Sequence, residues 1–420
     1  MYADLPLKQA EAQERIMSMP LASLDPSDPG LYASNTARFV FDRLRDESPI
    51  HRTEGGVAGR FWSVTRFEDI VKVDTNHGVF SSDWKLGGFN IVDRLPEHQL
   101  QSFMSMDPPV HDEQRRGIAP IVAPTNLVNF EKLIRERTTS VLDSLPRGET
   151  FDWVEKVSVE LTTLMLATLL DFPLEKRHQL TYWSDVITSA PELGVGIVAS
   201  AEERIAEMGR MADAMVELWN ERVNAPPRPD LISMLAHGPA TRNMTPAEFM
   251  GNLGVLVVGG NDTTRNSMTG GLLALHENPQ EWAKLRKNPA LVESLVPEIV
   301  RWQTPLIHMR RTALSDTELG EHRISKGDKV VMWYLSGNRD ERAIDSPNQF
   351  LIDRARPRQH LSFGFGIHRC VGNRLAEMQL RILWEEILKR FPVIEVVGEP
   401  TRVRSNIIHG FTQLPVRIPN

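Results

Sequence analysis

Apolar residues recur every three to four positions along most of the chain after residue 110, which is the spacing of one helix face. This spacing predicts helices over residues 37–47, 67–75, 127–144, 151–171, 175–189, 201–224, 246–276, 280–286, 290–302 and 373–391. Shorter apolar runs predict strands over residues 61–65, 308–313, 328–333 and 393–397, and again near the C-terminus. The pattern therefore predicts a fold that is mainly α with small β-sheets.

Two stretches follow neither pattern. Residues 1–35 are polar and contain the run Asp25-Pro26-Ser27-Asp28-Pro29-Gly30, so we expect a loop laid over the surface. We therefore divide the chain into an N-terminal arm, residues 1–36, and one large domain, residues 37–420. Residues 80–109 mix glycine and proline with apolar side chains and predict a long irregular loop, which in compact domains is usually functional or mobile.

Composition narrows the class of protein. A chain of 420 residues with 41% hydrophobic and 25% charged residues can bury a large core. The net charge of -7, without a basic segment, argues against a nucleic-acid partner. The longest apolar run, residues 253–258, is far shorter than the roughly 20 residues that span a bilayer, so we expect no transmembrane anchor. The N-terminus lacks the features of a secretory signal, and we expect a cytoplasmic monomer.

The only cysteine, Cys370, lies in the run Phe-Gly-Phe-Gly-Ile-His-Arg-Cys-Val-Gly at residues 363–372. A lone cysteine is most often a small buried hydrophobe. The three surrounding glycines, however, permit backbone angles and close approaches that suit a loop wrapped around something flat. The helical pattern from Asn373 onward puts Cys370 just before a helix start, which lowers the pKa of a thiol and stabilises the thiolate that ligates iron.

The predicted helix at 246–276 is interrupted at its middle by Gly259-Gly260-Asn261-Asp262-Thr263-Thr264. Glycine costs about 1 kcal/mol relative to alanine inside a helix, and a buried unpaired acid is expensive. One interpretation is close packing through the glycines, with Asp262 and Thr263 capping a kink. The other is that a flat cofactor lies against the glycines while the carboxylate and hydroxyl manage protons beside it.

Both motifs resemble those of the cytochromes P450. Phe-Gly-x-Gly-x-His-x-Cys-x-Gly resembles the haem-ligand loop of that family, and Gly-Gly-x-Asp-Thr-Thr is similar to its distal-helix motif. The resemblance covers residues 37–418 and implies the cytochrome P450 fold with haem b as cofactor. It further implies that Cys370 is the axial iron ligand, that Phe363 and Gly364 contact the cofactor, and that Asp262 and Thr263 deliver the protons that O–O cleavage requires.

Haem carries two propionates, which call for cations in fixed places. The resemblance implies four residues for this role: His111, Arg115, Arg311 and His368. Taken alone, any one of them reads as a solvated surface charge. In family order they are better interpreted together as propionate ligands.

Glu298 and Arg301 match the Glu-x-x-Arg helix motif of the family. The same spacing occurs at Glu113/Arg116 and Glu207/Arg210, so only its position ahead of the cysteine loop gives it weight. Residues three apart share a helix face, and a buried pair needs further partners. We interpret this pair as structural.

The resemblance also implies pocket walls that are mostly aliphatic. They come from Val255, Val258, Gly259, Leu306, Ile307 and Phe411, with the loop at 84–109 and residues 193–198. The competing interpretation is that each of these residues belongs to the ordinary hydrophobic core. As a set they indicate an apolar, uncharged substrate, because no arginine or lysine in these stretches is free to anchor an anion.

Three longer stretches look like the bacterial P450s that hydroxylate the terminal carbon of medium-chain alkanes and fatty acids. They are Gly-Gly-Asn-Asp-Thr-Thr-Arg-Asn-Ser-Met, Pro-Leu-Ile-His-Met-Arg-Arg-Thr-Ala and His-Arg-Cys-Val-Gly-Asn-Arg-Leu-Ala-Glu-Met-Gln-Leu. This implies a monooxygenase that inserts one oxygen atom of O2 into an unactivated C–H bond. The alternatives are a P450 for a terpene, steroid or other cyclic substrate, and a haem-thiolate sensor without turnover. The acid–alcohol pair argues against the sensor.

Electrons must come from outside, since no flavin or iron–sulfur domain is fused and one cysteine cannot hold a cluster. We expect an acidic [2Fe-2S] ferredoxin, reduced by a separate NAD(P)H-dependent reductase. Its predicted docking patch consists of Arg115, Arg116, Arg369 and Arg374. Glu377 stands where many P450s carry a basic residue, which alters this surface.

Overall fold

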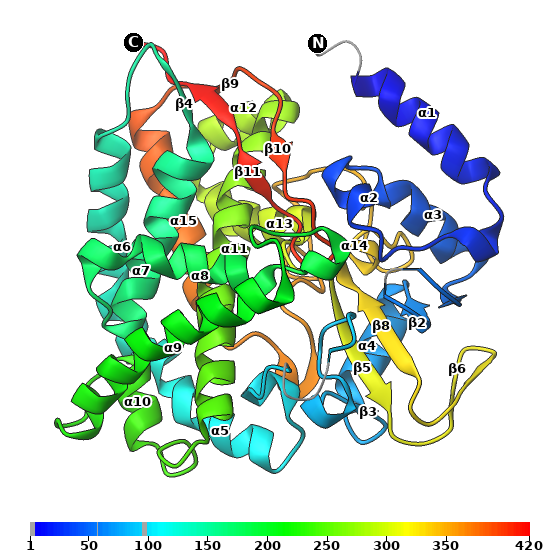
Figure 1. Cartoon of the computed structure of the whole chain (residues 1–420). Coiled ribbons are helices and arrows are strands. Elements are labelled where there is room, and N and C mark those ends of the chain that lie inside the picture. Colours follow the sequence, from blue (N-terminus) through cyan, green and yellow to red (C-terminus); the bar gives the residue numbers. More distant parts are fainter. Residues whose placement is uncertain (1–4, 57, 95–98) are drawn as a thin grey trace.

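The computed structural model describes residues 5–56, 58–94 and 99–420, with side chains from residue 9 onward. Helices fill one side of the molecule and the largest sheet lies on the other (Figure 1). The helices are α1 (Leu5–Ser18), α2 (Pro29–Ala33), α3 (Ala37–Glu47), α4 (Phe67–Thr75), α5 (Val110–Ile118), α6 (Pro124–Asp143), α7 (Glu160–Leu170), α8 (His178–Thr188), α9 (Ala201–Val223), α10 (Leu231–His237), α11 (Pro246–Glu277), α12 (Pro279–Lys287), α13 (Val292–Gln303), α14 (Tyr334–Gly337) and α15 (Asn373–Arg390). The mainly α fold predicted from the sequence is confirmed.

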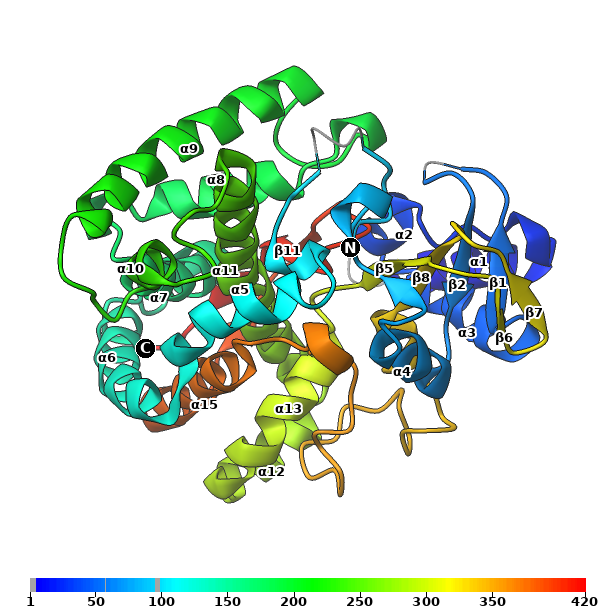
Figure 2. The same cartoon turned by 90° about the horizontal axis from the view of Figure 1, so that it is seen from below.

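Helix α11 is the central element and runs through the middle of the helical side (Figure 2). Its start is fixed by a capping box, in which the Thr245 side chain accepts a hydrogen bond from the Glu248 amide and the Glu248 carboxylate accepts one from the Thr245 amide. Pro246 occupies the first helical turn, where it loses no hydrogen bond. Because α11 packs against α7, α8, α13 and α15, residues at its middle lie deep inside the molecule.

The largest sheet has five strands in the order β1-β2-β8-β5-β3. Its strands are β1 (Ile50–Thr53), β2 (Phe61–Val64), β3 (Phe80–Ser81), β5 (His308–Ala313) and β8 (Lys329–Trp333). Strands β2 and β8 are parallel, and the other neighbours are antiparallel. Smaller sheets join β4 (Thr150–Asp152), β12 (Pro415–Arg417) and β9 (Glu395–Val396), then β6 (Thr317–Leu319) with β7 (His322–Ile324), and β10 (Thr401–Arg402) with β11 (Phe411–Gln413).

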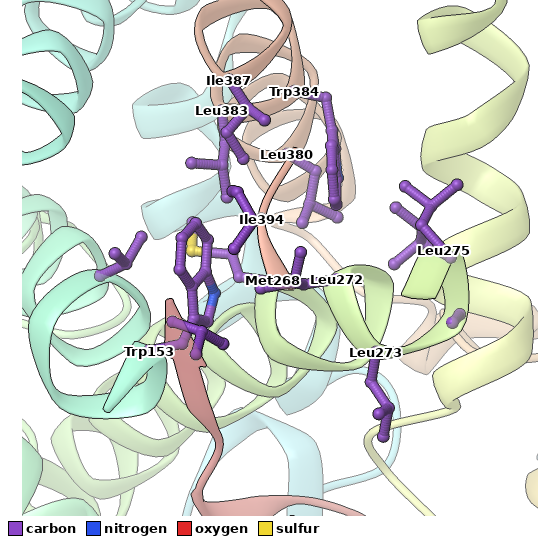
Figure 3. Packing of buried hydrophobic residues seen from close by; sticks show 14 of the residues in the cluster. Trp153, Met268, Leu272, Leu273, Leu275, Leu380, Leu383, Trp384, Ile387 and Ile394 are labelled. Atoms are coloured by element: carbon purple, nitrogen blue, oxygen red, sulfur yellow. The ribbon is translucent and has the colours of Figure 1, made fainter. Parts of the chain in front are cut away.

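A large hydrophobic core lies between α11 and α15. Met268 and Leu272 of α11 pack with Leu380 and Trp384 of α15 and with Trp153, and the exposed fraction of each is 2% or less (Figure 3). Burying a side chain of this size contributes about 1.5–3 kcal/mol. This core holds the central helix against the helix that follows Cys370.

The structure differs from the sequence prediction in several elements. Residues 1–35 were expected to form a loop but contain α1 and α2, and Ile16, Leu24 and Tyr32 are buried. The helix expected over 151–171 begins as strand β4 and the π-helical turn η7 (Val154–Val159) before α7 starts. Helix α10 and the β6–β7 pair were not predicted. Short elements are not separable from loops by periodicity, because they contain too few repeats.

The segment at 80–109, which was predicted to be irregular, begins with strand β3 and contains the 3-10 turns η3 (Trp84–Leu86) and η5 (Phe103–Ser105). The rest of its described residues are irregular, and residues 95–98 lie outside the described residues. Among the helices of the described residues, none has the length and apolar character needed to cross a membrane.

Candidate active site

The loop around Cys370 depends on two glycines with left-handed backbone angles. Gly364 has φ 65° and Gly366 has φ 63°, a region that side chains with a Cβ disfavour. At Gly366 a Cβ would also lie 2.4 Å from the carbonyl oxygen of Asp74. The Cys370 amide donates a hydrogen bond of 2.8 Å to the Phe363 carbonyl, which closes the loop. Two of the three glycines therefore have the special backbone angles that were expected, whereas Gly372 has φ -88°.

Asp74, in the last turn of α4, ties this loop to the sheet. Its carboxylate accepts hydrogen bonds from the Phe365 amide at 2.8 Å and the Tyr334 hydroxyl at 2.9 Å. It also forms an ion pair of 2.6 Å with Arg311, and both side chains are almost completely buried. Sequence analysis missed Asp74, because an acid in an amphipathic helix reads as a solvated charge.

Cys370 is exposed in this structure. Its side chain is solvent-accessible, yet burial raises the pKa of its thiol, against the opposing effects of the Gly372 amide and of Arg115 and Arg369. The two observations agree if the thiol faces an opening that is itself surrounded by protein. Sequence analysis expected the helix start to lower this pKa, but in the structure burial outweighs the α15 amides.

The two glycines at the middle of α11 have different surroundings. A Cβ at Gly260 would lie 3.0 Å from the Leu166 side chain, so this glycine permits close packing against α7. A Cβ at Gly259 would meet nothing within 4 Å. Close packing through a glycine therefore occurs at Gly260, whereas Gly259 leaves free space beside the helix, where the other interpretation predicts a flat cofactor. Helix α11 runs without a break through the motif.

Four of the accessible residues near Gly259 lie on one face of α11, whereas Val258, which is also partly exposed, lies on another face. Leu256, Gly259, Gly260 and Thr263 are all at least partly exposed although the helix is central. Their spacing of i, i+3, i+4 and i+7 puts them on a single helix face. We call this set the open stripe. Its only polar side chain is that of Thr263, whose hydroxyl donates a hydrogen bond of 3.0 Å to the Gly259 carbonyl.

Asp262 points away from the open stripe, toward α8. Its carboxylate lies 2.7 Å from Arg265 and accepts a hydrogen bond of 3.1 Å from Ser184. The same Arg265 nitrogen lies 2.6 Å from Asp185, so one guanidinium serves two carboxylates. Complete burial raises the pKa of Asp262 to about 6, although the positive charge of Arg265 opposes the rise. Ser184, Asp185 and Arg265 were not singled out in the sequence, because nothing local marks an α8–α11 contact.

The four predicted propionate ligands lie close to one another beside the cysteine loop. The His111 and His368 rings lie 4.5 Å apart, and Arg115 donates a hydrogen bond to the Arg369 carbonyl. Among the described residues, Nε2 of His111 and both ring nitrogens of His368 are buried without a hydrogen-bond partner. Burial lowers the pKa of His368, and the charge of Arg311 lowers it further. Arg311 was expected to serve as a propionate ligand, but in the structure it also forms an ion pair with Asp74.

Glu298 and Arg301 form a completely buried pair with two contacts of 2.7 Å. Arg301 donates to the carbonyls of Asn338, Pro347 and Gln349, while Glu298 accepts from the Leu351 amide and from Arg354. Burial alone would raise the pKa of Glu298, but Arg301 and Arg354 hold it below its usual value. The pair connects α13 to the segment that leads to the cysteine loop.

The predicted pocket residues separate into two groups. Val258, Gly259 and Leu306 are at least partly accessible. Val255, Ile307 and Phe411 are 9%, 0% and 2% exposed and belong to core clusters. Leu306 is bridged to Ile408, which joins the β5 end to the C-terminal segment.

Comparisons with known proteins agree with this geometry. Linalool 8-monooxygenase of Pseudomonas putida is 36% identical over 405 residues, which are 93% of this chain and 98% of that protein. Cytochrome P450-153 from Novosphingobium aromaticivorans is 45% identical with a TM-score of 0.89, and the match covers 94% of this chain and 99% of that one. CYP153D17 from Sphingomonas sp. PAMC 26605 is 44% identical with a TM-score of 0.88, over 94% and 99% of the two chains.

The Cytochrome P450 family model matches residues 202–418, and the chain belongs to that family. The protein is accordingly a monooxygenase with haem b as cofactor, which uses O2 and a redox partner. The residues present fit this group. Three features suit a flat, metal-containing group with carboxylate side chains: an exposed cysteine, open space at Gly259, and ring nitrogens of His111 (Nε2) and His368 that lack a hydrogen-bond partner among the described residues.

Proposed function

We propose that this monooxygenase hydroxylates the terminal carbon of medium-chain alkanes or fatty acids. The observation that carries the proposal is the open stripe, on which Leu256 and two glycines precede the single hydroxyl of Thr263. A surface of this kind contacts an aliphatic chain by dispersion and offers a polar substrate group only the Thr263 hydroxyl. Primary C–H bonds are the strongest in an alkane, so the site must select the chain end by position.

Cys370 holds the iron in this proposal, with Phe363 and Gly364 forming the loop beside it. His111, Arg115 and His368 bind the propionates, and Arg311 contributes the part of its guanidinium that Asp74 leaves free. When bound, haem b supplies the reductive activation of O2.

Asp262 and Thr263 deliver protons from the α8 side. Asp185 is 31% exposed in its side chain, Arg265 is 9% exposed and Asp262 is completely buried, so polar groups lead from the surface to the middle of α11. A carboxyl with a pKa of about 6 exchanges protons readily near neutral pH. Thr263 holds the last hydroxyl at the edge of the open stripe.

Electrons come from an acidic [2Fe-2S] ferredoxin that docks beside the cysteine loop. Arg116, Arg369 and Arg374 are exposed and have no carboxylate partner within the described part of the chain. Glu377 is 3.3 Å from Arg358, so its charge is compensated and leaves the three arginines free to meet an acidic partner.

A terpene or steroid substrate is the second candidate. Linalool 8-monooxygenase and, at 31% identity, a Rhodococcus jostii steroid C26-monooxygenase favour it. Product analysis by gas chromatography decides between the two, with purified holoenzyme, a surrogate ferredoxin and its reductase. We expect terminal alcohols from octane and dodecanoic acid at higher rates than any product from linalool. Faster turnover of linalool, with subterminal or no products from the linear chains, would favour the second candidate.

A further inference from the structure

Asp74 is a buried acid that the proposed function does not yet use. It lies in the last turn of α4, and its side chain is 1% exposed. An acid beside the predicted propionate ligands repels the negative group that those residues bind. A carboxylate at this place therefore has a role other than direct contact with the propionates.

The protein satisfies both oxygens of the Asp74 carboxylate. Oδ1 lies 2.6 Å from Nη2 of Arg311, while Oδ2 accepts hydrogen bonds from the Phe365 amide at 2.8 Å and the Tyr334 hydroxyl at 2.9 Å. These partners come from β5, the cysteine loop and α14. All three groups donate, which is the arrangement that suits an ionised carboxylate inside a protein.

Asp74 takes up only part of the Arg311 guanidinium. Nη2 pairs with Asp74 and Nη1 donates to the Arg310 carbonyl at 2.8 Å, while its other N–H groups have no acceptor among the described residues. Arg311 is close enough to the cysteine loop that its charge adds to the effect of burial in lowering the pKa of His368. The ion pair therefore leaves Arg311 as a hydrogen-bond donor toward the loop but compensates its charge.

This pairing changes the charge balance of the predicted propionate ligands. Burial lowers the pKa of His111 and of His368, so both rings are neutral at pH 7. Arg311 is paired with Asp74. Within the described part of the chain, Arg115 is thus the one cation of the four that has no carboxylate at ion-pair distance. Two propionates would face a single uncompensated positive charge.

Net negative charge next to an iron centre favours its oxidised form, because reduction adds an electron to a site that is already negative. The effect is strong inside a protein, where the low dielectric constant screens charges weakly. Net charge, hydrogen bonding and burial around the cofactor are the means by which a protein sets its reduction potential.

We propose that Asp74 is a positioning residue of the haem site, which orients Arg311, anchors the cysteine loop at Phe365 and lowers the reduction potential of the iron. The inference rests on the proposed propionate role of Arg311 and is independent of the substrate. A lower potential keeps the iron oxidised until a sufficiently strong reductant, such as the redox partner, docks and delivers its electron.

Spectroelectrochemical titration of the holoenzyme tests the proposal. Asp74→Asn keeps the shape of the side chain and removes its charge. The ratio of reduced to oxidised iron at a fixed potential should therefore rise by roughly tenfold, which is an upward shift of about 59 mV for one electron. Glu68→Gln is the matched control, because Glu68 is an exposed acid of the same helix and its loss should leave the potential unchanged.

Tyr334→Phe separates the charge of Asp74 from its structural contacts. This variant removes one hydrogen-bond donor from the carboxylate and keeps the negative charge, so the potential should fall. A general loosening of the site would instead shift both variants in the same direction. An unchanged potential in Asp74→Asn, or shifts of the same sign in both variants, would overturn the proposal. If Asp74→Asn retains no haem, Tyr334→Phe decides, and any result except a fall contradicts the charge effect.

Transfer of haem to a scavenging apoprotein tests the role of Arg311 separately. Arg311→Gln should lose haem several-fold faster than the unmodified protein, because a propionate loses its hydrogen-bond donors. An unchanged transfer rate would remove Arg311 from the propionate ligands. Faster transfer together with an unchanged potential in Asp74→Asn would keep Arg311 in that role and reject only the proposal for Asp74. The two failures are therefore distinguishable.

Discussion

Asp262 shows how one side chain is tuned by its surroundings. It is the buried member of a pair of carboxylates that share Arg265, and its pKa of about 6 compares with an ordinary value of 3.8. The folded protein therefore binds a proton more tightly at this site than the unfolded chain. The stability that this proton contributes is complete below about pH 3.8 and is lost as the pH rises through about 6.

Asp262→Asn should remove this pH dependence, because an amide does not titrate. Between pH 4 and 7, the free energy of unfolding of the unmodified protein, relative to the variant, should fall by on the order of 2 kcal/mol. Urea unfolding at a series of pH values measures the difference. Ser184→Ala removes a neighbour of the carboxyl and keeps the acid, so it should retain the dependence. Parallel curves for the unmodified protein and Asp262→Asn would contradict the raised pKa.

Individual residues differed in how well the sequence predicted them. Cys370, Glu298 and Arg301 were singled out by motifs, and the structure puts Cys370 in an accessible loop and the other two in a buried pair. Asp74 and Arg265 were missed. Their partners come from distant elements, so no local spacing in the sequence distinguishes them from acids and arginines that face solvent.

At the scale of elements, the cysteine loop depends on a backbone that only glycine tolerates at Gly366. Gly366→Ala combines a φ of 63° with a Cβ at 2.4 Å from the Asp74 carbonyl. We expect lower haem retention and a loss of stability larger than the roughly 1–2 kcal/mol of a left-handed angle alone. Gly59→Ala is the control, because Gly59 has φ 69° and a Cβ there would meet nothing within 4 Å. Haem absorbance and thermal unfolding of both variants measure the effect, and equal losses would contradict the role of the close approach.

Long elements with a repeated apolar face were predictable. The helix expected over 246–276 is present as Pro246–Glu277, since many turns of periodic sequence and a capping box specify it. The sequence prediction extended a helix over most of the strand Thr150–Asp152, because the π-helical turn that follows the strand continues the helical spacing of apolar residues. Which face of α11 is open, and which meets α8, depended on tertiary packing.

At the scale of the whole molecule, we expect the surface beside the cysteine loop to meet the redox partner. Arg374→Glu should reduce ferredoxin-supported turnover several-fold at low ionic strength, because it replaces an attractive charge with a repulsive one. The difference should shrink as salt screens both proteins. Arg323→Glu, an exposed position of the β6–β7 hairpin, is the control. Unchanged turnover of Arg374→Glu at low salt would exclude this docking surface.

Terminal hydroxylation requires that one atom of O2 reaches the end of an aliphatic chain. Mass spectrometry of the products from dodecanoic acid under ¹⁸O₂, with holoenzyme, ferredoxin and reductase, measures both the source of the oxygen and the carbon that receives it. We predict a product hydroxylated mainly at the terminal carbon and carrying one ¹⁸O atom. Oxygen derived from water would contradict monooxygenation, and a labelled product hydroxylated mainly at inner carbons would contradict selection of the chain end.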